Sequence, residues 1–197
     1  MNNTVPKGTT LAFLGRSGCG KDTQIGFLMK RPEFSGAATV AMGNIFRTIA
    51  KQDSLLGRKT REVIEQGGLL PEWLEIFALV SELAVKVRGE EILILDGTRR
   101  LEEAKILDEA LEFIGRPKAA AVLLDISPEE SKKRLIGRGR ADDKKERILN
   151  RLAWFETEVT PTIEYYRREG RLIKVNGEGT REEVFRELEI KLASHFT

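Results

Sequence analysis

Five short apolar runs, separated by longer segments with helical periodicity, constrain the fold of this chain more than any other feature. The runs cover residues 10–14, 37–41, 92–95, 119–124 and 172–175. Each run is continuously apolar rather than alternating, which is typical of parallel strands that are buried on both faces. Because these strands alternate with helical segments, the sequence predicts an α/β fold with a five-stranded parallel sheet between layers of helices.

Helical periodicity fills the segments between and after these runs. The predicted helices cover residues 21–30, 44–52, 59–66, 72–87, 102–113, 129–136, 144–168 and 181–193. A length of 197 residues fits one domain, and no linker or internal repeat divides it. The long helical stretch between the second and third strands is expected to lie over the carboxyl ends of the strands, where open α/β sheets bind ligands.

The chain contains very little cysteine and histidine, which limits the kinds of catalytic and metal site it can form. The chain has one cysteine, Cys19, and one histidine, His195. We therefore expect a reducing cytoplasmic location, no internal disulfide and no histidine-based metal cluster or catalytic triad. No apolar run reaches 18 residues, the N-terminus lacks a signal-peptide pattern, and the net charge is only +2. These observations indicate neither a membrane protein nor a nucleic-acid binder.

The first strand leads directly into a glycine-rich loop and a helix, with the sequence GRSGCGKDT at residues 15–23. Glycines let consecutive backbone N–H groups point inward, the helix N-terminus adds partial positive charge, and Lys21 can reach phosphate oxygens. The sequence thus predicts a P-loop NTPase fold of three-layer α/β/α type. A glycine turn before an exposed lysine is the alternative. The predicted phosphate contacts come from Gly18, Cys19, Gly20, Lys21, Asp22 and Thr23.

The loop departs from the strict P-loop pattern, which has Ser or Thr directly after the lysine. Here Asp22 stands at that position and Thr23 follows. The order Gly-x-x-Gly-x-Gly-Lys-x-Thr-Gln resembles the loop of adenylate kinases and other nucleoside monophosphate kinases, in which Gly is usual at the position of Asp22. We expect the negative charge of Asp22 to hold a magnesium-bound water, which would offset its repulsion of the phosphates.

The resemblance extends over nearly the whole chain and implies a site for a monophosphate acceptor. The segment MGNIFR at residues 42–47 resembles the family's Thr-Gly-Asp-x-x-Arg, in which the arginine binds the monophosphate. Arg47 fits that role, and Met42 replaces the threonine. The segment GGLLPE at residues 67–72 is similar to the family segment along the acceptor base, which implies contacts from Leu69 and Leu70. The implied acceptor-binding insertion covers about residues 42–71.

The third strand is followed by DGTRR at residues 96–100, which resembles the family's Asp-Gly-Phe-Pro-Arg. Asp96 is placed to orient hydrated magnesium, with a turn-forming role as the alternative. The resemblance also implies an acceptor contact at Gly97. Either Arg99 or Arg100 is the phosphate-binding arginine, and Arg99 is preferred because Glu103 then aligns with a family glutamine.

That alignment bears on which base is the acceptor. Glutamine can donate and accept hydrogen bonds, whereas an ionised Glu103 only accepts. Glu103 therefore favours a base edge rich in donors, such as guanine or the cytosine amino group, and weakens AMP as the sole acceptor. A kinase that prefers GMP, or CMP and UMP, is the alternative. The other possibility is that Glu103 faces solvent on its helix.

Arginines gather after the fourth strand. Arg134, Arg138, Arg140 and Arg151 match the family's Arg-Leu-x-x-Arg-Gly, Arg-x-Asp-Asp and Arg-Leu elements. Arginine forks stabilise the charge on a transferring phosphoryl group, which is the role implied for the last three, and Arg140 and Arg151 would also contact the acceptor. Arg134 is implied to stack on the donor adenine. A solvated basic helix face is the alternative. The lid between these elements shrinks to about residues 137–141.

Together these segments predict reversible phosphoryl transfer from Mg-ATP to a nucleoside monophosphate by a monomeric enzyme. Lys21 and the loop hold the donor, Arg47 and Arg99 hold the acceptor phosphate, and magnesium binds through water near Thr23 and Asp96. After the fifth strand, Gly179 is expected to pack on the donor adenine, with an ordinary turn as the alternative. The rivals are a P-loop kinase for another small phosphate acceptor and a nucleotide-binding regulator without efficient transfer.

Overall fold

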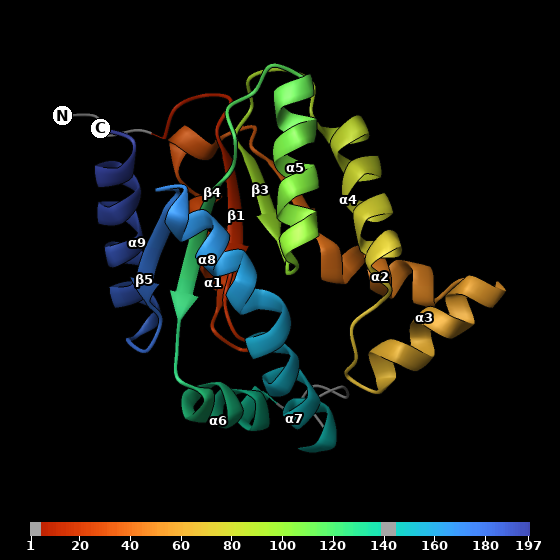
Figure 1. The fold of residues 1–197 in the computed structure, drawn as a ribbon. Coiled ribbons are helices and arrows are strands. Elements are labelled where there is room, and N and C mark those ends of the chain that lie inside the picture. The colour runs from red at the N-terminus through yellow and green to blue at the C-terminus, as the bar shows by residue number, and fades with distance from the viewer. Residues whose placement is uncertain (1–4, 139–144) are drawn as a thin grey trace.

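A computed structural model of the chain describes residues 5–138 and 145–197, and the side chains of residues 138, 145 and 146 lie outside the description. Five parallel strands form one sheet in the order β2-β3-β1-β4-β5 (Figure 1). Their bounds are β1 Thr10–Leu14, β2 Ala38–Ala41, β3 Leu93–Asp96, β4 Ala120–Asp125 and β5 Leu172–Asn176. The predicted parallel sheet is confirmed, and each strand end lies within one residue of its expected place.

Helices cover both faces of the sheet, which gives the three predicted layers (Figure 1). One core cluster joins the sheet to α1 and α9, and a second joins the opposite face to α2, α4, α5 and α8. None of the described helices is long and apolar enough to span a membrane. The helices are α1 Lys21–Leu28, α2 Met42–Ala50, α3 Leu55–Glu65, α4 Glu72–Lys86, α5 Leu101–Phe113, α6 Pro128–Arg138, α7 Lys145–Trp154, α8 Thr160–Arg168 and α9 Arg181–His195, with a 3-10 turn at Pro32–Phe34.

The central strand shows why the apolar runs are continuous. All five residues of β1 are buried, and successive side chains enter opposite cores. Leu11 and Phe13 pack with α1 and α9, whereas Ala12 and Leu14 pack on the other side. A strand with helices on both faces has no solvent side, so polar alternation would bury unpaired groups.

The helix expected over residues 144–168 is wrong as one uniform α-helix. The described part consists of α7, a π-helical segment Phe155–Val159, and α8. At the junction the Thr160 N–H donates to the Phe155 carbonyl, five residues earlier, which is the π-helical spacing. Pro161 explains the wider turn, because a proline ring in a regular helix clashes with the carbonyl four residues before it.

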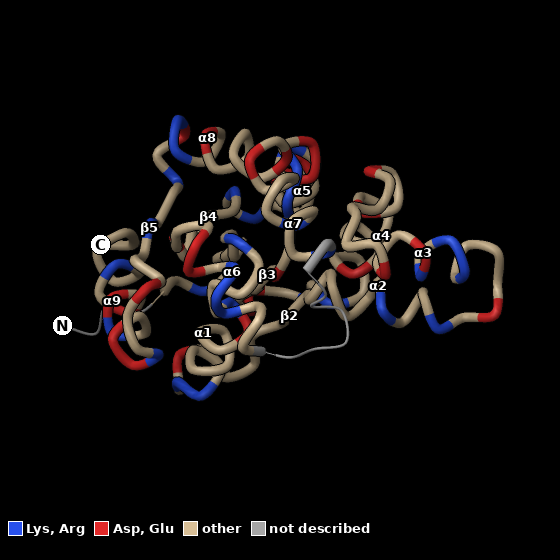
Figure 2. Tube along the Cα trace, turned by 90° about the horizontal axis from the view of Figure 1, so that it is seen from below, with Lys and Arg blue, Asp and Glu red and all other residues tan. Residues whose placement is uncertain are grey.

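Two groups of helices lie at the end of the sheet toward which the strands point (Figure 1). α6 and α7 lie on one side and the inserted α2 and α3 on the other, as Figure 2 shows from that end. Both α6 and α7 contain Lys and Arg positions (blue in Figure 2), and those of α6 include Lys132, Lys133 and Arg134. The carboxyl ends of the strands are thus bordered by cationic helices, as a site for phosphates requires.

Candidate active site at the carboxyl ends of the strands

The glycine-rich loop passes tightly between β1 and α1. A Cβ on Gly15 would lie 2.6 Å from the Leu124 carbonyl oxygen of β4, so only glycine fits there. Gly20 adopts φ +101° directly before α1, in the left-handed region that favours glycine. These two glycines let the loop fold tightly directly in front of the N-terminus of α1, and helix N-termini attract anions.

Lys21 lies over this loop. Its Nζ donates to the Gly15 carbonyl at 3.2 Å and lies 3.6 Å from the Cys19 sulfur. Burial by itself lowers the pKa of Lys21, but the charges of Cys19, Asp96 and Asp22 outweigh it and raise that pKa above its ordinary value. Lys21 is therefore a cation at the point where a donor phosphate would enter, and the exposed-lysine alternative is wrong.

Two carboxyl groups meet beside Lys21. Asp96 ends β3 next to β1, and its carboxyl interacts electrostatically with that of Asp22 on the first turn of α1. Burial and Asp22 raise the pKa of Asp96, while Lys21 and Arg99 act in the opposite direction. Mg²⁺ in kinases commonly binds through one or two carboxylates, water and substrate phosphates. The donor set of Asp22, Asp96 and Thr23 fits that ion, although the described residues hold no group of three or more His, Cys, Asp or Glu able to bind a metal alone.

Helix α6 packs directly on the loop. The Ser131 hydroxyl donates to the Ser17 carbonyl at 2.7 Å, and an Arg134 guanidinium nitrogen donates to the Cys19 carbonyl at 3.5 Å. A Cβ on Gly18 would lie 3.3 Å from Leu135 of the same helix. Arg134 is therefore beside the loop, as the donor site requires. The side chain of Arg138 and all of Arg140 lie outside the described residues.

A cavity of about 350 Å³ opens next to the loop at the carboxyl ends of β4 and β5. The residues around it were not selected from the sequence, although the turn that carries two of them was noted. Gly179, the predicted donor contact, directly follows one lining residue in the chain. The lining residues are Arg16, Asp125, Ile126, Ser127, Pro128, Asn176 and Glu178.

On the other side of Lys21, the predicted acceptor residues come together. A Cβ on Gly97 would lie 3.5 Å from the Cβ of Met42 and 3.8 Å from Nη2 of Arg99. Arg47, on α2, is exposed, and its Nη2 donates to Asn44 Oδ1 at 2.5 Å. The Arg47 guanidinium also lies beside Gly43, with Nη1 3.4 Å from the position of a Cβ there. Met42, Gly97 and Arg99 thus lie next to one another.

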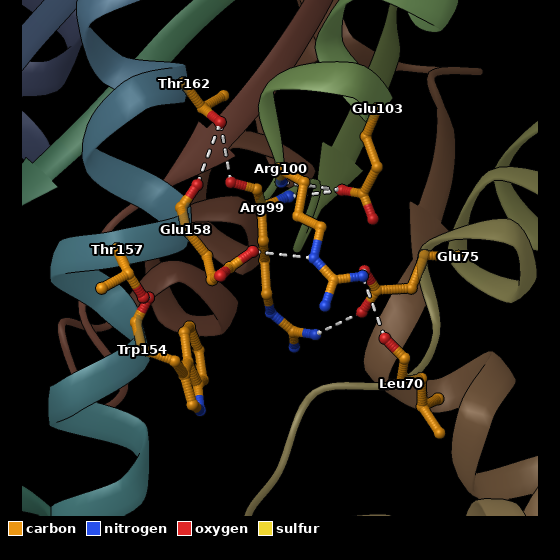
Figure 3. A network of polar contacts seen from close by, with 9 residues as sticks. All are labelled: Leu70, Glu75, Arg99, Arg100, Glu103, Trp154, Thr157, Glu158 and Thr162. Atoms are coloured by element: carbon orange, nitrogen blue, oxygen red, sulfur yellow. Dashed lines mark hydrogen bonds and ion pairs between the residues drawn. The ribbon is translucent and has the colours of Figure 1, made fainter.

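Arg99 and Arg100 differ in how fully they are engaged (Figure 3). Arg100 donates to Glu158 at 2.9 Å, to Glu75 at 3.0 Å and to the Leu70 carbonyl at 2.9 Å. Arg99 lies 3.7 Å from Glu75 and 5.5 Å from the centre of the Trp154 ring, which leaves N–H donors for a ligand. These contacts favour Arg99 over Arg100 as the phosphate-binding arginine.

Glu103 does not face solvent, so that alternative is wrong. Its side chain is 1% exposed, and Oε2 accepts from the backbone N–H groups of Arg99 at 2.5 Å and Arg100 at 3.3 Å. Glu103 therefore caps α5. Its other oxygen, Oε1, is buried close to Glu75, which sequence reasoning did not select. A role in reading a base stays a prediction.

Helix α7 connects the donor and acceptor sides. The Trp154 indole donates to the Gly67 carbonyl at 3.2 Å, and Asn150 donates to the Gln66 carbonyl at 3.0 Å. Gln66 and Gly67 lie shortly before Leu69 and the buried Leu70, the segment expected along the acceptor base. Arg151 lies three residues before Trp154, so both share one helix face. Trp154 was not selected from the sequence because a lone tryptophan carries no motif.

A glycine loop with a lysine, two acids and arginines on facing elements defines a P-loop phosphotransferase. The family model described as adenylate kinase matches residues 13–171. A Nostoc protein named Adenylate kinase 1 is 34% identical over 187 residues, covering 94% of this chain and 100% of the relative. Adenylate kinases of Leptospira biflexa and Thermus thermophilus are each 33% identical, covering 88% and 90% of this chain and 94% of each relative. The chain belongs to the adenylate kinase family and is an ATP-dependent nucleoside monophosphate kinase.

Proposed function

We propose that this enzyme reversibly transfers the γ-phosphoryl group of Mg-ATP to AMP, which gives two molecules of ADP. One observation carries the proposal. The positive charge of Arg99, on the acceptor side, reaches both Lys21 and Asp96 of the donor side and acts to lower the pKa of each. The lysine expected to hold the donor phosphates and the arginine expected to hold the acceptor phosphate are therefore close enough to interact electrostatically. The relatives named adenylate kinase support AMP as the acceptor.

Each side chain then has a role that needs no strong general base, since the acceptor phosphate is already nucleophilic. Lys21 and the loop at Gly18, Cys19 and Gly20 hold the donor phosphates. The cavity next to the loop receives the donor base, with Arg134 and Gly179 as the residues expected to contact it. Arg47 and Arg99 hold the acceptor phosphate, with the base along Leu69 and Leu70. Arg138, Arg140 and Arg151 balance charge on the transferring group.

Magnesium, when bound, neutralises phosphate charge and orients the phosphoryl group. Asp96 and Asp22 would hold it through their carboxylates or through water, with Thr23 close by on α1. The closeness of the two carboxyl groups supports this assignment, because a bound cation would offset the repulsion between them. We further propose one domain with an acceptor insertion at about residues 42–71, a short lid at about 137–141, a monomeric state and a cytoplasmic location.

The test is steady-state turnover with Mg-ATP and each of AMP, GMP, CMP and UMP. AMP is expected to give the highest kcat/KM. If GMP or CMP leads instead, AMP is wrong as the preferred acceptor. If no monophosphate is phosphorylated while ATP still binds, the proposal fails in favour of a nucleotide-binding regulator.

A further inference from the structure

Two glutamates from different helices lie beside Arg100 (Figure 3). Glu75 is on α4 and Glu103 on α5, and each side chain is only 1% exposed. Buried carboxyl groups are rare unless they are paired. Both carboxyl groups point toward Arg100 from the same side in Figure 3, so this buried pair is packed against the arginine segment and is not an exposed acidic cluster.

In each glutamate one carboxyl oxygen accepts hydrogen bonds and the other has no hydrogen-bond donor among the described residues. Glu103 uses Oε2 to accept from two backbone N–H groups, and Glu75 uses Oε2 to accept from Arg100. Oε1 of each glutamate is buried and has no donor among the described residues. The two carboxyl groups approach Arg100 from the same side (Figure 3), and Glu103 interacts electrostatically with Glu75. A single proton held between them satisfies both oxygens, whereas two bare carboxylates would repel.

We propose that Glu75 and Glu103 share a proton, and that Glu75 is thereby a positioning residue that keeps Arg99 available for the acceptor phosphate. The inference rests on the proposed function. While the pair holds its proton, Glu75 is neutral and stays 3.7 Å from Arg99, beyond hydrogen-bonding distance. When the proton leaves, a buried carboxylate faces Arg99 and competes with the phosphate of the acceptor for the same guanidinium.

The groups around Glu75 and Glu103 determine the pH at which the pair loses its proton. Burial and Glu103 raise the pKa of Glu75 to about 8, while Arg99 and Arg100 oppose the rise. The other charged or titratable groups packed around the pair are Glu158 of the π-helical segment, which binds Arg100, and Tyr166 of α8. Burial raises the pKa of Tyr166, so its phenol stays protonated near neutral pH and does not share this transition. The effect on acceptor binding should therefore develop between pH 7 and pH 9.

The first test compares the wild type with Glu75→Gln. The glutamine side chain keeps the shape, accepts from Arg100 and donates to Glu103, but it has no proton to lose. For the wild type, KM for AMP should rise by up to about tenfold between pH 7 and pH 9 with little change in kcat, since that is the fall in the protonated fraction of a group with a pKa of about 8. For Glu75→Gln, KM should stay flat. The matched control is Glu82→Gln on the same helix, which should follow the wild type.

A second readout separates this inference from the proposed function. Infrared spectroscopy of the wild-type protein without nucleotide should show a protonated carboxyl band that disappears between pH 7 and pH 9. That band should be missing from Glu75→Gln, and it does not depend on turnover or on the identity of the acceptor. Loss of all AMP kinase activity with the band present would refute the function and the role of Glu75 in it, but would support the shared proton. The absence of a titrating band, or the same KM profile in wild type and Glu75→Gln, would overturn the inference.

Discussion

The guanidinium of Arg16 lies 4.1 Å from the ring centre of Phe155, and this contact joins the glycine loop to the segment that follows α7. Arg16 also donates to Glu156 at 2.6 Å and to the Ile126 carbonyl at 3.2 Å. The π-helical turn brings Phe155 and Glu156 to this position. The glycine loop is thus fixed to the segment that directly follows the helix carrying Arg151.

Replacing Arg16 with alanine should therefore affect both stability and donor binding. We expect a loss of about 1–2 kcal/mol in the free energy of unfolding, from one cation–π contact and two hydrogen bonds. KM for ATP should rise several-fold, because the loop and the cavity wall both lose a partner. Urea unfolding and steady-state kinetics measure the two effects.

Arg31→Ala is the matched control for that experiment. Arg31 also lies over an aromatic ring, Phe185, at 5.2 Å, and it pairs with Glu189 on α9, away from the phosphate loop. It should lower stability slightly and leave KM for ATP unchanged. Equal changes in KM for the two variants would contradict the role given to Arg16.

Alanine substitutions of Arg99 and Arg100 should affect different properties of the enzyme. Arg99→Ala should raise KM for AMP by about a hundredfold, the cost of a lost charge-assisted contact to phosphate, with little change in stability. Arg100→Ala should instead lower the free energy of unfolding by about 2–4 kcal/mol, because three hydrogen bonds inside the protein are lost. A large KM effect from Arg100→Ala without destabilisation would reverse the assignment.

Stability should also depend on pH through Glu75. Its pKa is about 8 in the folded protein against an ordinary value of 4.5, so the folded state binds the extra proton. The resulting stabilisation is complete below about pH 4.5 and is lost as the pH rises through 8. Between these limits the wild type should lose up to about 1.4 kcal/mol per pH unit relative to Glu75→Gln. Urea unfolding of both proteins at pH 5, 6, 7 and 8 measures this difference, and parallel curves would refute it.

The carboxyl of Asp22 should contribute to magnesium use. Asp22→Gly restores the residue usual in the family and removes one member of the Asp22–Asp96 pair. We expect the magnesium concentration for half-maximal turnover to rise several-fold, with kcat at saturating magnesium largely kept. Asp22→Asn checks that the effect comes from charge. An unchanged magnesium dependence in both variants would show that Asp22 does not hold the hydrated ion.

The sheet and the phosphate loop were predictable because local sequence carries their cause. Strands buried on both faces must be apolar throughout, as in β1, and a loop that wraps phosphate needs glycine at positions such as Gly15. The strand order was not predicted, since it depends on long-range packing. The π-helical turn was also missed, although Pro161 was its visible signal.

The parts of the site that sequence reasoning missed depend on contacts between distant segments. Glu75 reads as a solvated glutamate in a helix, and only the packing of α4 against α5 buries it beside Glu103. Arg16 stands in the glycine loop, but the loop pattern assigns it no role. Its contact with Phe155 could not be predicted, because Phe155 lies far away in the sequence. The sequence favours Arg99 as the phosphate-binding arginine because Glu103 then aligns with a family glutamine. The structure adds a physical reason, since Arg100 is held by three hydrogen bonds inside the protein.

The central claim is transfer of a phosphoryl group between nucleotides at Lys21, and the most direct measurement follows the γ-phosphorus of labelled ATP. With AMP and magnesium, the label should appear in the β-position of ADP in the wild type. The signal should fall by about a thousandfold in Lys21→Met, which removes a cation from the transferring group, while Lys30→Met should match the wild type. Label released only as inorganic phosphate, or transfer that persists in Lys21→Met, would contradict the account.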